Sequence, residues 1–160
     1  MTAALRFDPI RLPPECEQLR KEVRAFLAEE IAAGTFGAKG WLGMTWPKQY
    51  GGHERSFLER YVVTEEMRVA NAPTRRFFVA DRQSGPLLLR FGTEDQRQRF
   101  LPAIARGELS FAIGMSEPDA GSDVAALRTT AVRDGDEFVV NGQKMWCTGA
   151  GLPNTLLAMY

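Results

Sequence analysis

Two short runs of the sequence combine residue types that could hold a flat aromatic ligand. The first, GMSEPDAGSDVAA at 114–126, places Ser116 after an apolar stretch and puts Gly121 and Ser122 in a loop of small residues. Backbone amides in such a loop can approach an anion closely. The second, NGQKMWCT at 141–148, ends with Trp146 and Thr148, which would share one side of a strand. An indole beside hydroxyls could stack on a planar redox ring and bond its edge.

Each of these features also has an ordinary structural explanation. A tryptophan is more often part of a protein core than a ligand contact. Ser116 and Thr148 are common strand residues, and Gly121 with Ser122 could form a simple turn. The sequence has no Gly-x-Gly-x-x-Gly run, so the usual dinucleotide fingerprint is absent. The residues alone therefore leave a flavin as one of several possible ligands.

The elements that would position these runs change type near residue 107. Before it, apolar residues recur at helical spacing, and we expect helices from Pro13 and Pro14 to about residue 31, over 56–69 and around 77–90. The sequence TEDQ at 93–96 is a capping box that would open a further short helix. Pro102 should kink or restart that helix, because proline lacks an amide donor.

After residue 110 the pattern is typical of short strands and turns. We expect strands at 111–115, 128–133, 137–140, 144–148 and 155–160, with Asp-Gly at 134–135 and Asn-Gly at 141–142 as tight turns. This predicts an α+β protein: an N-terminal all-α helical domain at 1–109, then an incomplete antiparallel β-meander or barrel domain at 110–160. The last strand would present an open edge, which indicates either a docking edge for a partner or a partial chain.

Composition excludes several classes of protein. The 160 residues carry 20 basic and 20 acidic side chains, so charge gives no reason to expect nucleic acid or an anionic membrane as partner. No apolar run is long enough to span a bilayer and residues 1–14 lack a signal pattern, which favours a cytoplasmic location. Two distant cysteines and the single loop residue His53 predict no metal site.

Both runs, in this order, resemble the motifs of the acyl-CoA dehydrogenase family. The resemblance extends to GWLGMTWP at 40–47, to YGG at 50–52 and to residues 88–107. The chain is similar to the family's N-terminal helical domain and the start of its middle β-domain. The resemblance implies an oxidoreductase of lipid metabolism that binds FAD. In β-oxidation it would remove hydrogen across the α,β bond of an acyl-CoA thioester, with hydride transfer to FAD.

The resemblance also implies roles for single residues and partners. Met115 (through its backbone) and Ser116 would contact the flavin ring. The other predicted cofactor contacts are Gly121, Ser122, Trp146 and Thr148, with Ser122 also near the substrate and Thr148 near flavin N5. The partners would be acyl-CoA, an electron-transfer flavoprotein or similar acceptor, and other subunits of a homo- or hetero-oligomer.

The family's catalytic carboxylate lies in a C-terminal domain that has no counterpart in this sequence. We therefore expect no catalytic residue here and no dehydrogenation by these 160 residues alone. Two other readings stay open. One is an acyl-CoA oxidase or flavin monooxygenase on the same scaffold. The other is a non-catalytic partner subunit, regulatory subunit or binding module.

Overall fold

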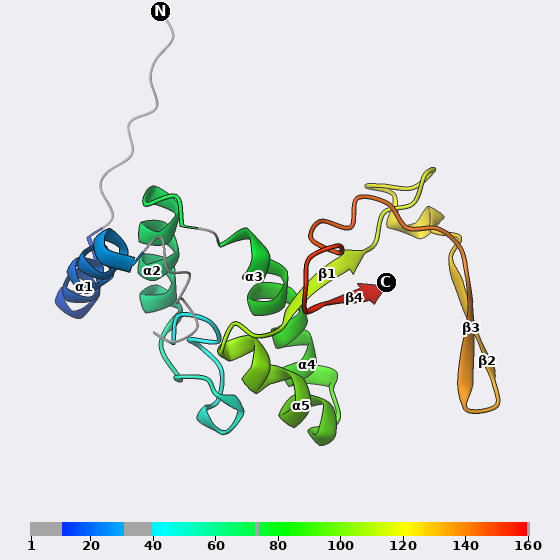
Figure 1. Ribbon diagram of the computed structural model, residues 1–160, viewed down its shortest axis with the longest axis horizontal. Helices are drawn as coiled ribbons and strands as arrows, with labels where there is room; N and C mark the ends of the chain where they lie inside the picture. The colour runs from blue at the N-terminus through cyan, green and yellow to red at the C-terminus, as the bar shows by residue number, and fades with distance from the viewer. Residues whose placement is uncertain (1–10, 31–39, 73, 160) are drawn as a thin grey trace, which may run out of the picture.

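The helical half of the chain packs as two groups of helices, and the strands follow at one end (Figure 1). A computed structural model describes residues 11–30, 40–72 and 74–159. The helices are α1 (Pro14–Glu30), η1 (Lys48–Tyr50), α2 (Phe57–Val69), α3 (Arg75–Val79), η2 (Ala80–Ser84), α4 (Gly85–Phe91), α5 (Glu94–Ala105) and η3 (Val124–Ala126). The strands are β1 (Ser110–Gly114), β2 (Thr130–Asp134), β3 (Glu137–Asn141) and β4 (Thr155–Met159).

Helices α1 and α2 form the first group. Their apolar faces meet in a core that includes Val23, Leu27, Val63 and Met67. Beside this core Glu66 is buried and accepts hydrogen bonds from Arg20 and Arg24 of α1, with Arg24 Nε 2.5 Å from Glu66 Oε2. The helix predicted from Pro14 is thus confirmed, although its expected last core residue, Ile31, lies outside the described residues.

A second core joins the remaining helices to β1. Trp46, Leu101 and Ile104 are fully buried in it, and Phe111 of β1 packs against it. The capping box at Thr93 is confirmed: its side chain accepts the Gln96 amide, and the Gln96 side chain accepts the Thr93 amide. Helix α5 then passes through Pro102 without the predicted restart, because the buried residues on either side of the proline hold the helix against this core.

The segment from α3 to α4 contains a wide π-helical turn, η2, where the sequence predicted one helix over 77–90. The Trp46 indole lies so close to Gly85 that a Cβ atom there would be 2.1 Å from a ring carbon. Within the turn, the buried Asp81 carboxylate accepts the Gly43 amide at 2.7 Å and pairs with Arg82 at 2.7 Å. The wide turn therefore accommodates both the buried Asp81 carboxylate and the Trp46 indole.

The strand half confirms the α+β class but corrects two details of the predicted meander. Strands β2 and β3 form the expected antiparallel hairpin around Gly135, whose φ is +61°. Strand β1 pairs with β4 in parallel, from Ser110 opposite Thr155 to Gly114 opposite Met159. Residues 142–154 lead the chain from the end of β1, where the Met145 amide bonds the Ser116 carbonyl, back to its start, where the Ser110 amide bonds the Asn154 carbonyl. After this crossover β4 runs in the same direction as β1.

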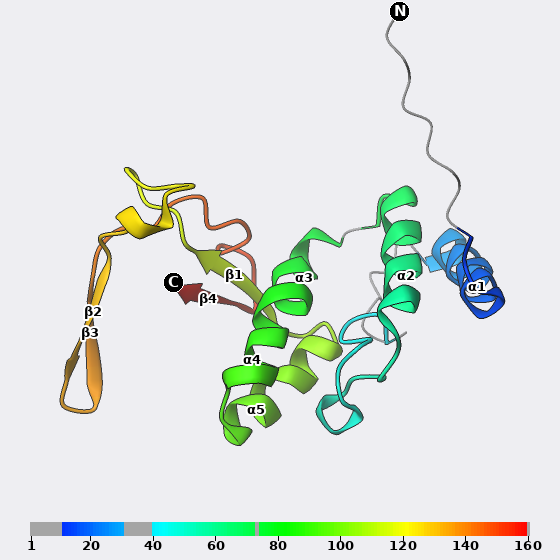
Figure 2. The same ribbon diagram turned by 180° about the vertical axis from the view of Figure 1, so that it is seen from behind.

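Residues 144–148 are not a strand, which is the second correction. Trp146 has a φ of +57°, in the left-handed region, and the Thr148 amide donates to the Trp146 carbonyl at 2.8 Å. The Asn-Gly pair at 141–142 likewise ends β3 without starting a new strand. The hairpin β2–β3, which is exposed along its whole length, projects away from the helices in both views (Figures 1 and 2).

Among the helices in the described part of the chain, none combines the length and apolar character that crossing a bilayer requires.

Candidate functional site

A shallow groove of about 220 Å³ lies where β1 ends, and both sequence runs contribute to it. Four of the six predicted cofactor contacts line it: Met115 and Ser116 from the first run, and Trp146 and Thr148 from the second. The remaining lining residues are Val79, Gln83, Ile113 and Met145. The indole and the two hydroxyl-bearing side chains therefore converge on one concave surface.

The two runs are brought together by hydrogen bonds at the end of β1. Met115 and Ser116 directly follow the strand, and the Met145 amide donates to the Ser116 carbonyl at 2.8 Å. Phe111 of β1 packs against the second helical core, and this contact anchors the strand on the helices. Val79 and Gln83 reach the same groove from the α3–η2 segment.

Trp146 is the most exposed large apolar side chain in the described chain, with 80% of its surface accessible. Its left-handed backbone turns the indole out of the loop, and Thr148 follows after a tight turn. The prediction placed both residues on one side of a strand. The structure brings both to one groove by a different route, a turn at Trp146. An apolar ring that is exposed beside hydroxyl groups is suited to cover another flat ring.

A buried ion pair is formed by residues adjacent in sequence to the groove lining, and sequence reasoning did not identify it. Lys144 Nζ donates to Glu117 Oε1 at 2.9 Å and to the Met115 carbonyl at 3.1 Å. The Glu117 carboxylate also accepts the amides of Arg128 at 2.7 Å and Thr129 at 2.9 Å. The two charged side chains are 6% and 7% exposed. The only available signal was that the first run carries three acidic residues, Glu117, Asp119 and Asp123, while the second carries one basic residue, Lys144.

These contacts lower the pKa of Glu117 from 4.5 to about 2. The largest cause is hydrogen bonding from Thr129, followed by the Arg128 amide and by Lys144, and burial opposes them. The carboxylate is therefore ionised at neutral pH. Its role here is to bind the loop at 128–129 to the end of β1, since it accepts bonds from both and holds Lys144 between the two runs.

Gly121 and Ser122 are not among the residues that line this groove. They lie in an exposed loop that follows a tight turn between Glu117 and Ala120. A Cβ atom added to Gly121 would meet nothing within 4 Å, and Gly121 is not among the positive-φ glycines. Neither packing nor backbone conformation therefore requires glycine there. A close approach by an external ligand would require it, so the assignment of both residues stays a prediction.

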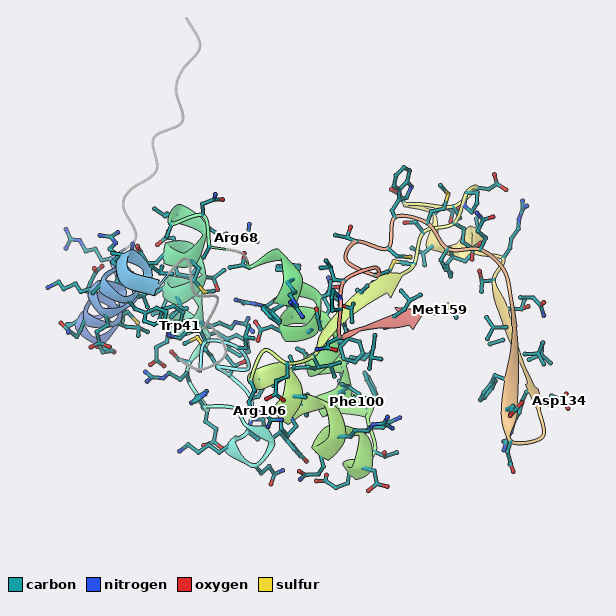
Figure 3. The ribbon with its side chains drawn as sticks, viewed as in Figure 1. Trp41, Arg68, Phe100, Arg106, Asp134 and Met159 are labelled. Atoms are coloured by element: carbon teal, nitrogen blue, oxygen red, sulfur yellow. The ribbon has the colours of Figure 1, made fainter. Side chains whose placement is uncertain are left out.

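A larger hollow of about 630 Å³ adjoins the groove and shares Val79 and Thr148 with it. Its walls are Phe78 and Val79 from α3, Phe111 from β1 and Leu152 from the crossover, with the guanidinium groups of Arg68 and Arg76 beside them. Figure 3 shows Arg68 on the side of α2 that faces α3. Sequence reasoning assigned no ligand contact to α3, because its residues form an ordinary helical pattern without a motif.

The residues present fit a flavin ring. Val79, Ile113 and the Trp146 indole offer apolar surface, while Ser116, Thr148 and Gln83 offer donors and acceptors at its edge. An isoalloxazine has two apolar faces and a polar rim of nitrogens and oxygens, so it needs this combination of contacts.

Known proteins resemble this chain in sequence and fold. The profile of the acyl-CoA dehydrogenase N-terminal domain matches residues 13–108, and that of the acyl-CoA dehydrogenase middle domain matches residues 112–160. The chain is 42% identical over 160 residues to acyl-CoA dehydrogenase FadE26 of Mycobacterium tuberculosis. That alignment covers 86% of this chain and 40% of the relative. The chain thus spans less than half of the length of this relative.

Two solved structures illustrate the likeness of the fold. The ChsE4–ChsE5 complex from Mycobacterium tuberculosis has a TM-score of 0.79 and 42% identity, covering 88% of this chain and 40% of that one. A glutaryl-CoA dehydrogenase from Mycobacterium smegmatis in complex with FADH2 has a TM-score of 0.74 and 28% identity. It covers 84% of this chain, and the match spans 39% of its own length.

Proposed function

Because the chain belongs to the acyl-CoA dehydrogenase family, we propose that it forms the flavin-edge half of the active site of an FAD-dependent acyl-CoA dehydrogenase. Such an enzyme oxidises the α,β carbon–carbon bond of an acyl-CoA thioester. The observation that carries the proposal is the single groove lined by Met115, Ser116, Trp146 and Thr148, which come from both family motifs. The solved relative that holds FADH2 supports a flavin as the cofactor.

In this proposal the four residues contact one face and the rim of the ring. The bound FAD supplies the acceptor for a hydride from the substrate. The Trp146 indole covers the ring, while the Ser116 and Thr148 hydroxyls bond polar atoms of its rim. The peptide between Met115 and Ser116 borders the groove and adds backbone contacts. A ring held at several points keeps one orientation, which hydride transfer requires.

The adjoining hollow is our proposed site for the acyl group. It meets the groove at Thr148, so an acyl thioester in the hollow would have its reacting carbons beside the ring edge. Phe78, Phe111 and Leu152 provide apolar surface for a hydrocarbon chain. Ser122, on the exposed loop of the first motif, would contact the substrate from outside the hollow.

We propose no catalytic base among the described residues. No carboxylate lines either the groove or the adjoining hollow in that part of the chain. Glu117 is the nearest carboxylate in the motif, but its oxygens accept bonds from Lys144, Arg128 and Thr129, and its pKa of about 2 makes it a poor proton acceptor at neutral pH. The base would therefore come from another part of the protein or from a partner subunit, and the ChsE4–ChsE5 complex supports an oligomeric assembly.

Titration of FAD into the 160-residue chain tests the cofactor assignment. We expect the visible spectrum of the flavin to shift on binding and the fluorescence of the tryptophans to fall. In the Trp146→Phe variant, most of the fall in tryptophan fluorescence on FAD binding should be lost, while the shift of the flavin spectrum should remain. A chain that is folded by circular dichroism and leaves the FAD spectrum unchanged at millimolar concentration would refute flavin binding by these residues.

Activity is tested on the protein purified from its own cells. We expect it to reduce a dye acceptor with an acyl-CoA and to release the 2-enoyl-CoA product, identified by mass spectrometry. Rapid reoxidation of the reduced protein by air would favour the oxidase reading instead. Isolation of a protein that holds flavin but reduces no dye with any acyl-CoA would favour a non-catalytic subunit.

A further inference from the structure

Lys144 and Glu117 are a buried pair of opposite charges that the proposed chemistry does not use. Each is next in sequence to a residue that lines the groove, Ser116 or Met145, and both side chains are almost completely removed from solvent. Burying two charges is costly, and a buried pair contributes little to stability compared with apolar residues of the same size. The bonds from Glu117 to the loop at 128–129 are structural, but they leave the contribution of the Lys144 charge unexplained. The second contact of Lys144, to the Met115 carbonyl, suggests a role for it.

The contact to Met115 connects the charge of Lys144 to the groove surface. The ammonium donates to the Met115 carbonyl oxygen at 3.1 Å, and this carbonyl belongs to the same peptide group as the Ser116 amide. The peptide group is conjugated, so a cation at its oxygen draws electron density from its nitrogen. Hydrogen bonds that share one group polarise each other, and the effect is larger away from water. The Met115–Ser116 peptide thereby becomes a stronger donor.

Glu117 controls how much of the Lys144 charge reaches the groove. Its carboxylate is 2.9 Å from the ammonium, and its remaining bonds hold it to the amides of Arg128 and Thr129. The other charged pair on this loop, Arg128 with Asp119, is exposed to solvent and separated by 3.4 Å. Solvent screens that pair, so the buried one dominates the field at the end of β1.

We propose that Lys144 is a positioning residue that polarises the Met115–Ser116 peptide toward the bound flavin, and that Glu117 sets the strength of this effect. An electropositive groove edge stabilises a ring that gains negative charge, and so raises the reduction potential of the flavin. This inference rests on the proposed function, since it assumes that the groove holds a flavin. It goes further by assigning a function to a pair of residues that touch neither ring nor substrate.

Opposite charge changes distinguish this role from a structural one. In Lys144→Met the cation is lost, and we expect the midpoint potential of the bound flavin to fall. In Glu117→Gln the cation is no longer neutralised, and we expect the potential to rise. A tenfold change in the ratio of oxidised to reduced flavin in either direction equals about 30 mV for a two-electron couple. Lys144→Arg should stay near the wild-type value, and Lys48→Met, at an exposed pair with Glu54, is the matched control.

Equal directions of change in the two variants, or no change in either, would overturn the proposal. The chain without FAD offers an independent measurement, the proton chemical shift of the Ser116 amide in NMR spectra. It should move to higher field in Lys144→Met and to lower field in Glu117→Gln. If Lys144→Met does not fold, the rise expected in Glu117→Gln still tests the predicted sign, with the charge-conserving Lys144→Arg as the unchanged reference. A wild-type chain that binds no FAD would refute the proposed function, while the amide shifts would still decide whether the pair polarises the peptide.

Discussion

The amide of Met145 donates a 2.8 Å hydrogen bond to the carbonyl of Ser116. This bond joins two motifs between which the chain forms the β2–β3 hairpin. The hairpin extends away from the groove, with Asp134 at its tip (Figure 3). Because the motifs meet at the base of the hairpin, changes along its arm should leave the groove intact, while changes at the groove should leave the fold intact.

Replacing Trp146 by alanine should weaken FAD binding about tenfold, equal to about 1.4 kcal/mol of lost ring contact. The indole is 80% exposed without a ligand, so its removal should change the free energy of unfolding by no more than about 0.5 kcal/mol. Isothermal titration with FAD and urea denaturation measure the two effects. Phe138→Ala is the matched control, since this ring is also exposed but lies on β3. Equal FAD affinity in both variants would contradict the assignment of the indole to the ring.

Removing the hydroxyl of Thr148 in Thr148→Val should slow reduction of the bound flavin by about three- to tenfold, the effect of one hydrogen bond. The valine keeps the shape of the side chain, so FAD affinity should change less than the rate. Stopped-flow absorbance of the complete protein with an acyl-CoA follows this step. Thr148→Ser restores the hydroxyl and should restore the rate. A valine variant as fast as wild type would show that the hydroxyl makes no contact of importance in the reaction.

Local patterns in the sequence predicted the helices, the hairpin and four of the residues that line the groove. Proline and capping residues mark where helices begin, and Asp-Gly marks the hairpin turn, so these features depend on few neighbours. Four of the predicted contacts meet in the groove because the first motif begins, and the second motif ends, beside the end of β1. These parts of the fold are encoded within a few residues of where they appear.

The parts that were missed depend on contacts between distant residues. The pairing of β1 with β4 joins residues 45 positions apart, from Ser110 to Thr155, and nothing near either strand indicates its direction. The left-handed backbone of Trp146 is unusual for a tryptophan, so strand alternation was the natural expectation for 144–148. Lys144 and Glu117 each look like surface residues, and only the fold shows that they are buried together.

Gly85→Ala should destabilise the second core although alanine favours helices. A Cβ atom at this position would lie 2.1 Å from a Trp46 ring carbon and 2.8 Å from the Ala80 carbonyl oxygen. Overpacking of this kind costs about 1–3 kcal/mol, more than the gain of up to about 1 kcal/mol from helix propensity. Urea denaturation should show a lower midpoint. Gly151→Ala, where a Cβ atom meets nothing within 4 Å, should leave the midpoint unchanged. A more stable Gly85→Ala variant would mean that the ring has room to move.

The contribution of Glu117 to stability should disappear in acid. Its pKa is lowered from 4.5 in the unfolded chain to about 2 in the folded one, so the folded state favours the ionised form. The stabilisation is therefore fully present above about pH 4.5 and is lost as the pH falls toward 2. Thermal melting between pH 2 and 7 should show Glu117→Gln well below wild type at pH 6, with the difference shrinking steadily below pH 4.5. Glu108→Gln, which breaks an exposed pair with Arg106, should follow wild type closely across the whole range. A gap between wild type and Glu117→Gln that stays constant down to pH 2 would show that the amide loses packing at 117 and that ionisation of the carboxylate contributes nothing.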